Sequence, residues 1–147
     1  MSTRIRLLEA RDRSDWERLF RGYIAFYKAT VPDDVIESTW QRIIDRTPDF
    51  HVGLAAVDER DRPIGIAHIL FHRSTWTTGH YCYLEDLFVE PGLRARGIGR
   101  ELIEAVYREA DARRCARTYW MTQEFNYRAR GLYDQLATKT PFVQYRR

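Results

Sequence analysis

Two adjacent carboxylates stand in the middle of a strand-like segment. Glu85 and Asp86 interrupt residues 81–89, which are otherwise mostly aromatic, β-branched or leucine. Neighbouring strand residues face opposite sides, so at least one acid should point toward a covered surface. A partly buried carboxylate can have its pKa raised toward neutrality and accept a proton, which makes Glu85 the candidate general base. The structural alternative is that Glu85 only pairs with an arginine, and we expect Asp86 to cap a backbone group or to pair with an arginine.

A glycine loop of the form Arg-x-x-Gly-x-Gly follows this strand. It runs from Arg94 to Gly99 and leads into an amphipathic helix predicted over residues 98–113. Glycines let the backbone approach a ligand closely, and the free N–H groups of a helix start, with arginines around them, suit a pyrophosphate. A dinucleotide fingerprint would need a third glycine at position 102, and a Walker loop would need Gly-Lys-Ser/Thr. The sequence has neither, so both common nucleotide motifs are disfavoured.

These motifs together resemble a known family. Arg94-x-x-Gly97-x-Gly99 after Leu-Glu-Asp-Leu-Phe-Val is similar to the acetyl-CoA signature of the GCN5-related N-acetyltransferases (GNAT). Downstream, the segment from Asn126 to Tyr133 looks like their second CoA-contacting segment. The resemblance covers about residues 64–145. It looks closest to the branch that holds polyamine acetyltransferases and the fungal enzymes described as acetylating histones or D-amino acids.

The resemblance implies acetyl-CoA as cofactor and a role for each matching residue. Glu85 matches the base of the polyamine branch, and Tyr133 matches the general acid that meets the CoA thiolate. Leu87 would offer its backbone N–H to the oxyanion, while Phe88 and Val89 would bond the pantetheine amides. The implied cofactor-binding set is Leu87, Phe88, Val89, Arg94, Ala95, Arg96, Gly97, Ile98, Gly99, Arg100, Asn126 and Tyr133. Packing alone could explain Tyr133, and helix capping alone could explain Asn126.

The acceptor pocket is expected between the first two helices and the loop before residue 81. The candidate substrate-binding residues there are Tyr27, Trp40, Trp76 and Glu85, since aromatics and acids suit a cationic amine. Asp33 and Asp34 are better explained as the favourable first turn of a helix. Arg42, Arg46 and Arg73 could equally meet an amino-acid carboxylate.

The expected function is direct transfer of acetyl from acetyl-CoA to a primary amine of a small molecule, such as a polyamine or an amino acid. The alternatives are a protein lysine or N-terminal acetyltransferase and a CoA-binding regulatory module without turnover. The presence of both Glu85 and Tyr133 favours an enzyme, because binding alone needs neither.

The elements that must position these residues follow from periodicity and breakers. Strands are predicted at 3–8, 51–57, 63–71, 81–89, 116–122 and 141–145, and helices at 12–29, 33–46, 98–113 and 126–138. This order, βααβββαβαβ, is that of the GNAT fold, a mixed α/β class with a mostly antiparallel sheet flanked by helices. In that fold, the resemblance implies, the fourth and fifth strands splay apart and the thioester lies between them.

Length and composition bound the remaining possibilities. With 147 residues and 44% hydrophobic content, the chain is expected to form a single N-acetyltransferase domain over residues 1–147. A net charge of +3 without a block of five like charges predicts no nucleic-acid partner, and no apolar run reaches the roughly 18 residues of a membrane helix. Cys82 and Cys115 lack metal or redox spacing and predict reduced thiols in a cytoplasmic protein. His68 and His72 fall on a strand, so no metal site is expected, and a homodimer is plausible for the family.

Overall fold

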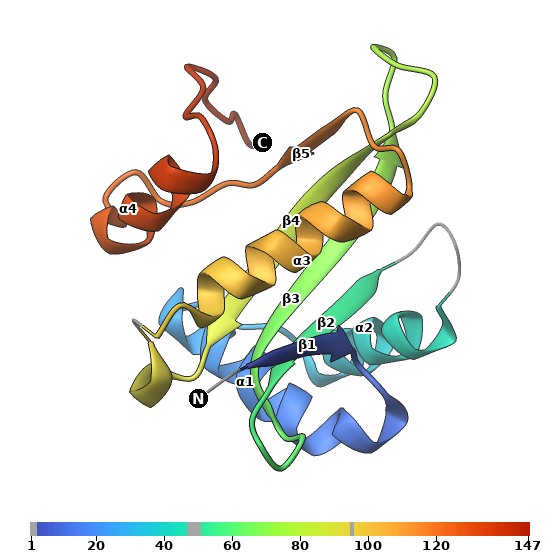
Figure 1. Cartoon of the computed structure of the whole chain (residues 1–147), viewed down its shortest axis with the longest axis vertical. Coiled ribbons are helices and arrows are strands. Elements are labelled where there is room, and N and C mark those ends of the chain that lie inside the picture. The colour runs from blue at the N-terminus through green and yellow to red at the C-terminus, as the bar shows by residue number, and fades with distance from the viewer. Residues whose placement is uncertain (1–2, 47–50, 95) are drawn as a thin grey trace.

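A five-stranded sheet with its strands in chain order forms the centre of the computed structural model, which describes residues 3–46, 51–94 and 96–147 (Figure 1). The strands are β1 (Arg4–Leu7), β2 (Val52–Val57), β3 (Pro63–Arg73), β4 (His80–Val89) and β5 (Arg117–Tyr119). The helices are α1 (Arg13–Phe26), α2 (Asp33–Asp45), α3 (Ile98–Ala112) and α4 (Tyr127–Leu136), with short 3-10 turns at Ala10–Asp12 and Pro91–Leu93. The first four strands pair antiparallel and β5 joins β4 in parallel, which confirms the predicted mixed sheet.

The helices cover both faces of the sheet because β3 alternates apolar residues toward each side. Ala67 and Ile69 belong to the core beneath α3, whereas Ile66 belongs to the core beneath α1 and α2. In Figure 1, α3 crosses the near face and α1 and α2 lie behind the sheet. Trp16 is 0% exposed and lies in the core beneath α1 and α2.

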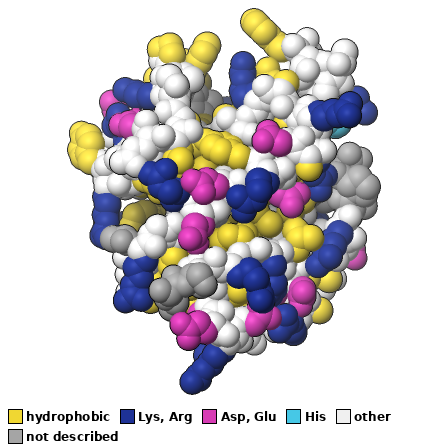
Figure 2. Space-filling view, viewed as in Figure 1, with side chains coloured by type: hydrophobic (Ala, Val, Ile, Leu, Met, Phe, Trp, Pro, Cys, Tyr) yellow, Lys and Arg dark blue, Asp and Glu magenta, His cyan; other side chains and the backbone are white. Residues whose placement is uncertain are grey.

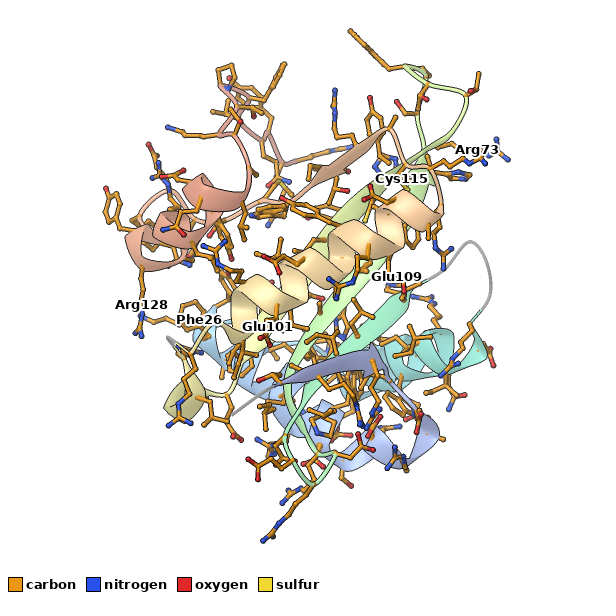
Figure 3. The ribbon with its side chains drawn as sticks, viewed as in Figure 1. Phe26, Arg73, Glu101, Glu109, Cys115 and Arg128 are labelled. Carbon is orange, nitrogen blue, oxygen red and sulfur yellow. The ribbon has the colours of Figure 1, made fainter. Side chains whose placement is uncertain are left out.

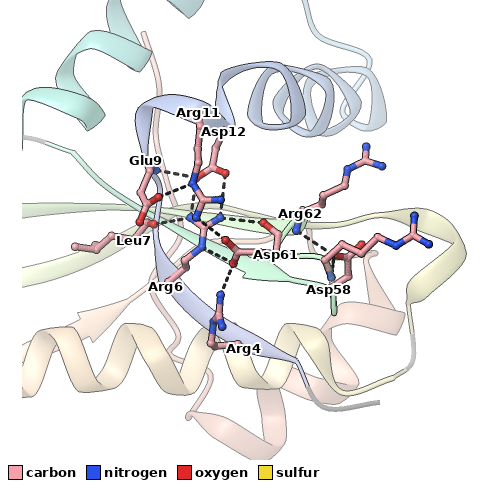
Figure 4. Close-up of polar contacts among 10 residues, drawn as sticks. Arg4, Arg6, Leu7, Glu9, Arg11, Asp12, Asp58, Asp61 and Arg62 are labelled. Carbon is pink, nitrogen blue, oxygen red and sulfur yellow. Dashed lines mark hydrogen bonds and ion pairs between the residues drawn. The ribbon is translucent and has the colours of Figure 1, made fainter.

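An ion-pair network ties the first strand to the turn before β3 (Figure 4). Arg6 holds Asp12 through two hydrogen bonds of 2.7 and 3.0 Å and reaches Asp61 at 3.0 Å. Arg4 and Arg11 also pair with Asp61. The Arg6 and Arg11 guanidiniums lower the pKa of Asp61 to about 2. Asp12 is the residue before α1, and its carboxylate accepts hydrogen bonds from Arg6 and from the Glu9 N–H instead of capping the helix.

The predicted final strand is the main error in the predicted order of elements. Residues 141–145 form no strand and are exposed, and β5 covers only three of the seven residues predicted for it. A strand is stable only when a neighbour takes its backbone hydrogen bonds, and within the described chain the 141–145 segment pairs with nothing. Residues 47–50, between the predicted helix at 33–46 and the predicted strand at 51–57, lie outside the described ranges.

Basic and acidic side chains are interspersed over the face that carries α3, as Figure 2 shows. No helix within the described ranges is long and apolar enough to cross a bilayer.

Candidate active site

A β-bulge in β4 brings both carboxylates to one face of the sheet. Asp86 pairs with His68 and Leu84 pairs with Ile69, which leaves Glu85 as the extra residue of β4. Leu84 packs in the core beneath α3, while Asp86 faces α1. Because the extra residue breaks the alternation of the strand, Glu85 and Asp86 share the α1 side.

The environment of Glu85 raises the pKa of its carboxyl. Its side chain is exposed, yet the protein around it removes enough water to raise its pKa, and the neighbouring Asp86 charge raises that pKa further. The neighbouring Tyr83 hydroxyl opposes the effect and lowers the pKa. Within the described chain no arginine or lysine forms an ion pair with Glu85, so the predicted alternative of an arginine pair is not seen.

β4 and β5 diverge directly beside these carboxylates. Their parallel pairing ends at Tyr83 with Tyr119, while β4 continues to Val89, so the β5 side of β4 has no described strand partner beyond that point (Figure 1). The splay implied by the family resemblance is thus present.

The direction of the backbone N–H groups along β4 decides which of the predicted residues can bond the cofactor at the open edge. Glu90 N–H donates to the Ile64 carbonyl of β3 at 2.9 Å. Alternate residues of a strand point their amides the same way, so Phe88 also faces β3, while Leu87 and Val89 face the open edge. The prediction that Phe88 bonds pantetheine amides is therefore wrong: its backbone faces β3 and its ring, 7% exposed, packs beneath α1. Leu87 and Val89 stay as predicted cofactor contacts.

Gly97, the residue before α3, adopts a left-handed conformation with φ of 80°. A Cβ added there would meet nothing within 4 Å, so the space in front of the helix start is open to a ligand. The first N–H groups of α3 have no partner within the helix, and the positive end of its dipole favours an anion. These features fit the pyrophosphate of acetyl-CoA.

The side chains around this loop are less uniform than predicted. Ile98 is buried in the core, Arg96 is exposed, and Arg100 hydrogen-bonds Gln135. Arg94 donates to the Val89 carbonyl at 3.1 Å and lies 5.1 Å from the centre of the Phe88 ring. Ala95 lies outside the described residues. Contact of these side chains with cofactor remains a prediction.

Tyr133 lies on α4 and packs against the core beneath α3. Asn126 caps the helix by accepting from the Ala129 N–H at 3.4 Å, as predicted. Tyr133 packs edge-on against Trp120 at 5.4 Å. Burial, and then the nearby Tyr27, raise the pKa of Tyr133 to about 12. This phenol therefore keeps its proton at neutral pH.

The predicted acceptor residues separate in the structure. Tyr27 ends α1, packs on Tyr23 at 5.0 Å and lies close enough to influence Tyr133. Trp40 is 5% exposed and packs on Trp16 at 4.8 Å, so its assignment to the pocket is corrected to core packing. Trp76, 85% exposed, lies in the β3–β4 connection and is not brought to Glu85. Arg73 also lies at the far end of the sheet from the start of α3 (Figure 3).

Four tyrosines near Glu85 were not all foreseen. Tyr83 shares its face and lies close enough to lower its pKa, and Tyr119 stacks on Tyr83 with ring centres 4.9 Å apart. Tyr23 reaches the Glu85 carbonyl at 3.4 Å and packs on Tyr27. The spacing of Tyr83 two residues before Glu85 could have predicted its face, whereas Tyr119 needed the register of β5.

The partner of Asp86 is a histidine, not the predicted arginine or backbone group. His68 Nδ1 lies 2.8 Å from Asp86 Oδ2, and His68 is 1% exposed. His72, four residues along β3, bonds the Tyr119 hydroxyl at 2.7 Å through Nε2. Across the described ranges no group of three or more His, Cys, Asp or Glu side chains could hold a metal.

Sequence comparison identifies the family of the chain. Residues 16–137 match the sequence model described as the Acetyltransferase (GNAT) family. The chain belongs to the GNAT family. The expected fold, the acetyl-CoA cofactor and the class of N-acetyltransferase are thereby confirmed.

Relatives and solved structures of GNAT proteins agree with this assignment. The chain is 37% identical over 143 residues to the D-amino-acid N-acetyltransferase HPA3 of Saccharomyces cerevisiae, covering 97% of this chain and 89% of the relative. It is 29% identical to the thialysine N-epsilon-acetyltransferase of Mus musculus, covering 94% of this chain and 85% of that protein. The fold matches AAC(6')-Iy, solved with a CoA-containing bisubstrate analogue, with a TM-score of 0.85 at 22% identity over 100% and 98% of the two chains.

Proposed function

We propose that this GNAT protein transfers acetyl from acetyl-CoA to a primary amine of a small molecule, with an amino acid or a similar amine as acceptor, and that residues 1–147 work as one catalytic domain. The observation that carries the proposal is the Glu85 carboxylate, placed by a bulge beside the open edge of β4, with a raised pKa and tyrosines around it. The curated relatives named for D-amino acids and thialysine support a small amine as acceptor.

Glu85 deals with the charge of the amine. An amine with a pKa of about 10.4 is neutral in roughly one molecule in 2,500 at pH 7, a cost of about 4.6 kcal/mol. A carboxylate of raised pKa can take that proton directly or through a water, and it attracts the ammonium form before transfer. The rings of Tyr23, Tyr27 and Tyr83 suit a cation that approaches Glu85.

The open edge of β4 and the end of α4 deal with the thioester, which acetyl-CoA supplies as the acyl donor. The Leu87 N–H faces the open edge and can donate to an oxyanion. Tyr133, with its pKa raised to about 12, is a poor proton donor to the leaving thiolate, whose thiol form has a pKa of about 8.5, since full transfer would be uphill by about 5 kcal/mol. Tyr133 therefore acts by donating a hydrogen bond to the leaving sulfur.

A protein acceptor is the second candidate. A ribosomal-protein-alanine N-acetyltransferase from Brucella melitensis shares the fold, with a TM-score of 0.80 at 21% identity, so the fold alone does not select the acceptor. A regulatory module that binds CoA without turnover would need neither Glu85 nor Tyr133 in these positions.

A homodimer and a cytoplasmic location are part of the same proposal. The segment after α4 carries Phe142, Val143 and Tyr145, which are 76–94% exposed, and the outer edge of β5 has no described strand partner. Cys82 and Cys115 are free thiols, which suits a reducing compartment. Light scattering of the protein and of a Phe142→Ser, Tyr145→Ser variant tests the dimer, which the double substitution should weaken.

Release of free CoA thiol tests the acceptor. We expect turnover with D- or L-amino acids, lysine analogues or polyamines, and none with alanine-terminated or lysine-rich peptides at equal concentration. Turnover only with the peptides would favour the protein acceptor. Calorimetric binding of acetyl-CoA with no turnover on either group would favour the regulatory module.

A further inference from the structure

A chain of hydrogen bonds runs from α1 through β3 to β4 under the site. Trp16 Nε1–H donates to His68 Nε2 at 2.9 Å, and His68 Nδ1 lies 2.8 Å from Asp86 Oδ2. Trp16 and His68 are 0% and 1% exposed, and the Asp86 side chain is 15% exposed. Three buried or nearly buried polar groups from three elements thus satisfy one another, and the mechanism above uses none of them.

The donors and acceptors of this chain determine where the protons lie. An indole N–H can only donate, so His68 Nε2 carries no proton. The single proton of the ring must then sit on Nδ1, from which it is donated to Asp86. Phe20 meets the imidazole edge-on, with ring centres 4.9 Å apart, and restrains its orientation. His68 is held neutral, and the negative charge of Asp86 is not cancelled by a histidinium.

The bulge in β4 places the negative charge of Asp86 beside Glu85. Because Glu85 is the extra residue of β4, the two carboxylates are successive in the chain and lie on the same face. We propose that Trp16, His68 and Asp86 act as positioning residues that hold an uncancelled negative charge beside Glu85 and so make Glu85 a stronger proton acceptor. This inference rests on the proposed role of Glu85 as the base.

The other titratable groups around the pair do not neutralise it. From α1, Tyr23 keeps its proton, because burial and the Asp86 charge raise its pKa. From β4 and β5, Tyr83 and Tyr119 have raised pKa values, that of Tyr83 about 12. His51, before β2, has its pKa lowered by burial, with smaller contributions from His68 and from Arg42 of α2. Within the described ranges, Asp86 pairs with His68 and with no arginine or lysine.

The side-chain carboxyl of Glu85, followed by 13C NMR against pH, tests the inference without any turnover. Asp86→Asn keeps an oxygen that can accept from His68 but removes the charge. We expect the Glu85 titration to move about one pH unit lower in Asp86→Asn, as two neighbouring charges at the effective dielectric of a protein surface imply. The acidic limb of kcat/KM should move in the same direction.

Two further variants separate positioning from packing. His68→Gln can still accept from Trp16 and donate to Asp86, so the Glu85 titration should stay near that of the wild type. Ile66→Val is the matched control, because Ile66 lies two residues before His68 on the same face of β3. The substitution removes buried carbon without changing a polar atom, so the Glu85 titration should be unchanged.

Two results would overturn the inference. One is a Glu85 titration that does not move in folded Asp86→Asn. The other is a 15N spectrum of the wild type at pH 7 that shows His68 protonated at both ring nitrogens, a test that needs no variant. Turnover in Glu85→Gln, whether lost or retained, tests only the proposed role of Glu85 as the base. A failure of that proposal can therefore be distinguished from a failure of the inference about Asp86.

Discussion

Replacing Gly97 by alanine separates the backbone strain of the glycine loop from its role in binding. With φ at 80°, alanine at this position costs about 1–2 kcal/mol of backbone strain. The added Cβ meets no protein atom within 4 Å, so no clash adds to that cost. For a chain of this length, the melting temperature should fall by roughly 3–8 °C.

The same methyl group would stand in the space where the pyrophosphate meets the start of α3. Because a displaced phosphate loses charge-assisted hydrogen bonds, we expect calorimetry to show acetyl-CoA affinity at least about tenfold weaker, or about 1.4 kcal/mol. Gly97→Val should abolish binding while the chain stays folded. Gly92→Ala is the control, since its Cβ also meets nothing within 4 Å and its φ is not positive; it should change neither quantity. Unchanged acetyl-CoA affinity in folded Gly97→Ala would refute the assignment of the glycine loop as the pyrophosphate site.

Three other substitutions test the site and its surroundings. The raised pKa of Glu85 means that the folded state favours its protonated form, a contribution that is present below the unfolded pKa and lost as pH rises through the folded pKa. Glu85→Gln should therefore raise the melting temperature at pH 7 by roughly 1–3 °C and leave it unchanged at pH 4, a small effect because the carboxylate is exposed; a lower melting temperature at pH 7 would contradict this. Tyr133→Phe should reduce kcat by about tenfold or more with little change in KM for acetyl-CoA, and an unchanged kcat in steady-state assays would remove Tyr133 from catalysis. Trp40→Ala should cost about 3–5 kcal/mol in denaturant unfolding, because Trp40 is a core residue; a stable variant with a raised KM for the amine would restore it to the acceptor pocket.

Local sequence signals predicted the parts of the site that depend on few neighbours. The glycine loop, the start of α3 and the Asn126 cap each follow from short patterns, and the structure contains the Gly97 turn, the start of α3 at Ile98 and the Asn126 cap.

Features that depend on pairing across the sheet were not predictable. The bulge at Glu85 exists only in the register of β4 against β3, so strand alternation alone assigned the carboxylates to opposite faces. The His68 contact joins Trp16 and Asp86, which are seventy positions apart in the printed sequence. The sequence pattern around an aromatic residue such as Trp40 is the same whether the residue lies in a core or in a pocket. Only the packing of α2 on α1 shows that Trp40 belongs to the core.

The pH dependence of acetyl transfer by the wild type and by Glu85→Gln tests the central claim most directly. With an amine acceptor found by thiol release, we expect Glu85→Gln to lower kcat/KM by about 10²-fold or more below neutral pH, since that is the size of general base catalysis. The loss should shrink as pH approaches the pKa of the amine, and acetyl-CoA affinity should be unchanged. Equal rates for both proteins at every pH would show that Glu85 is not the base.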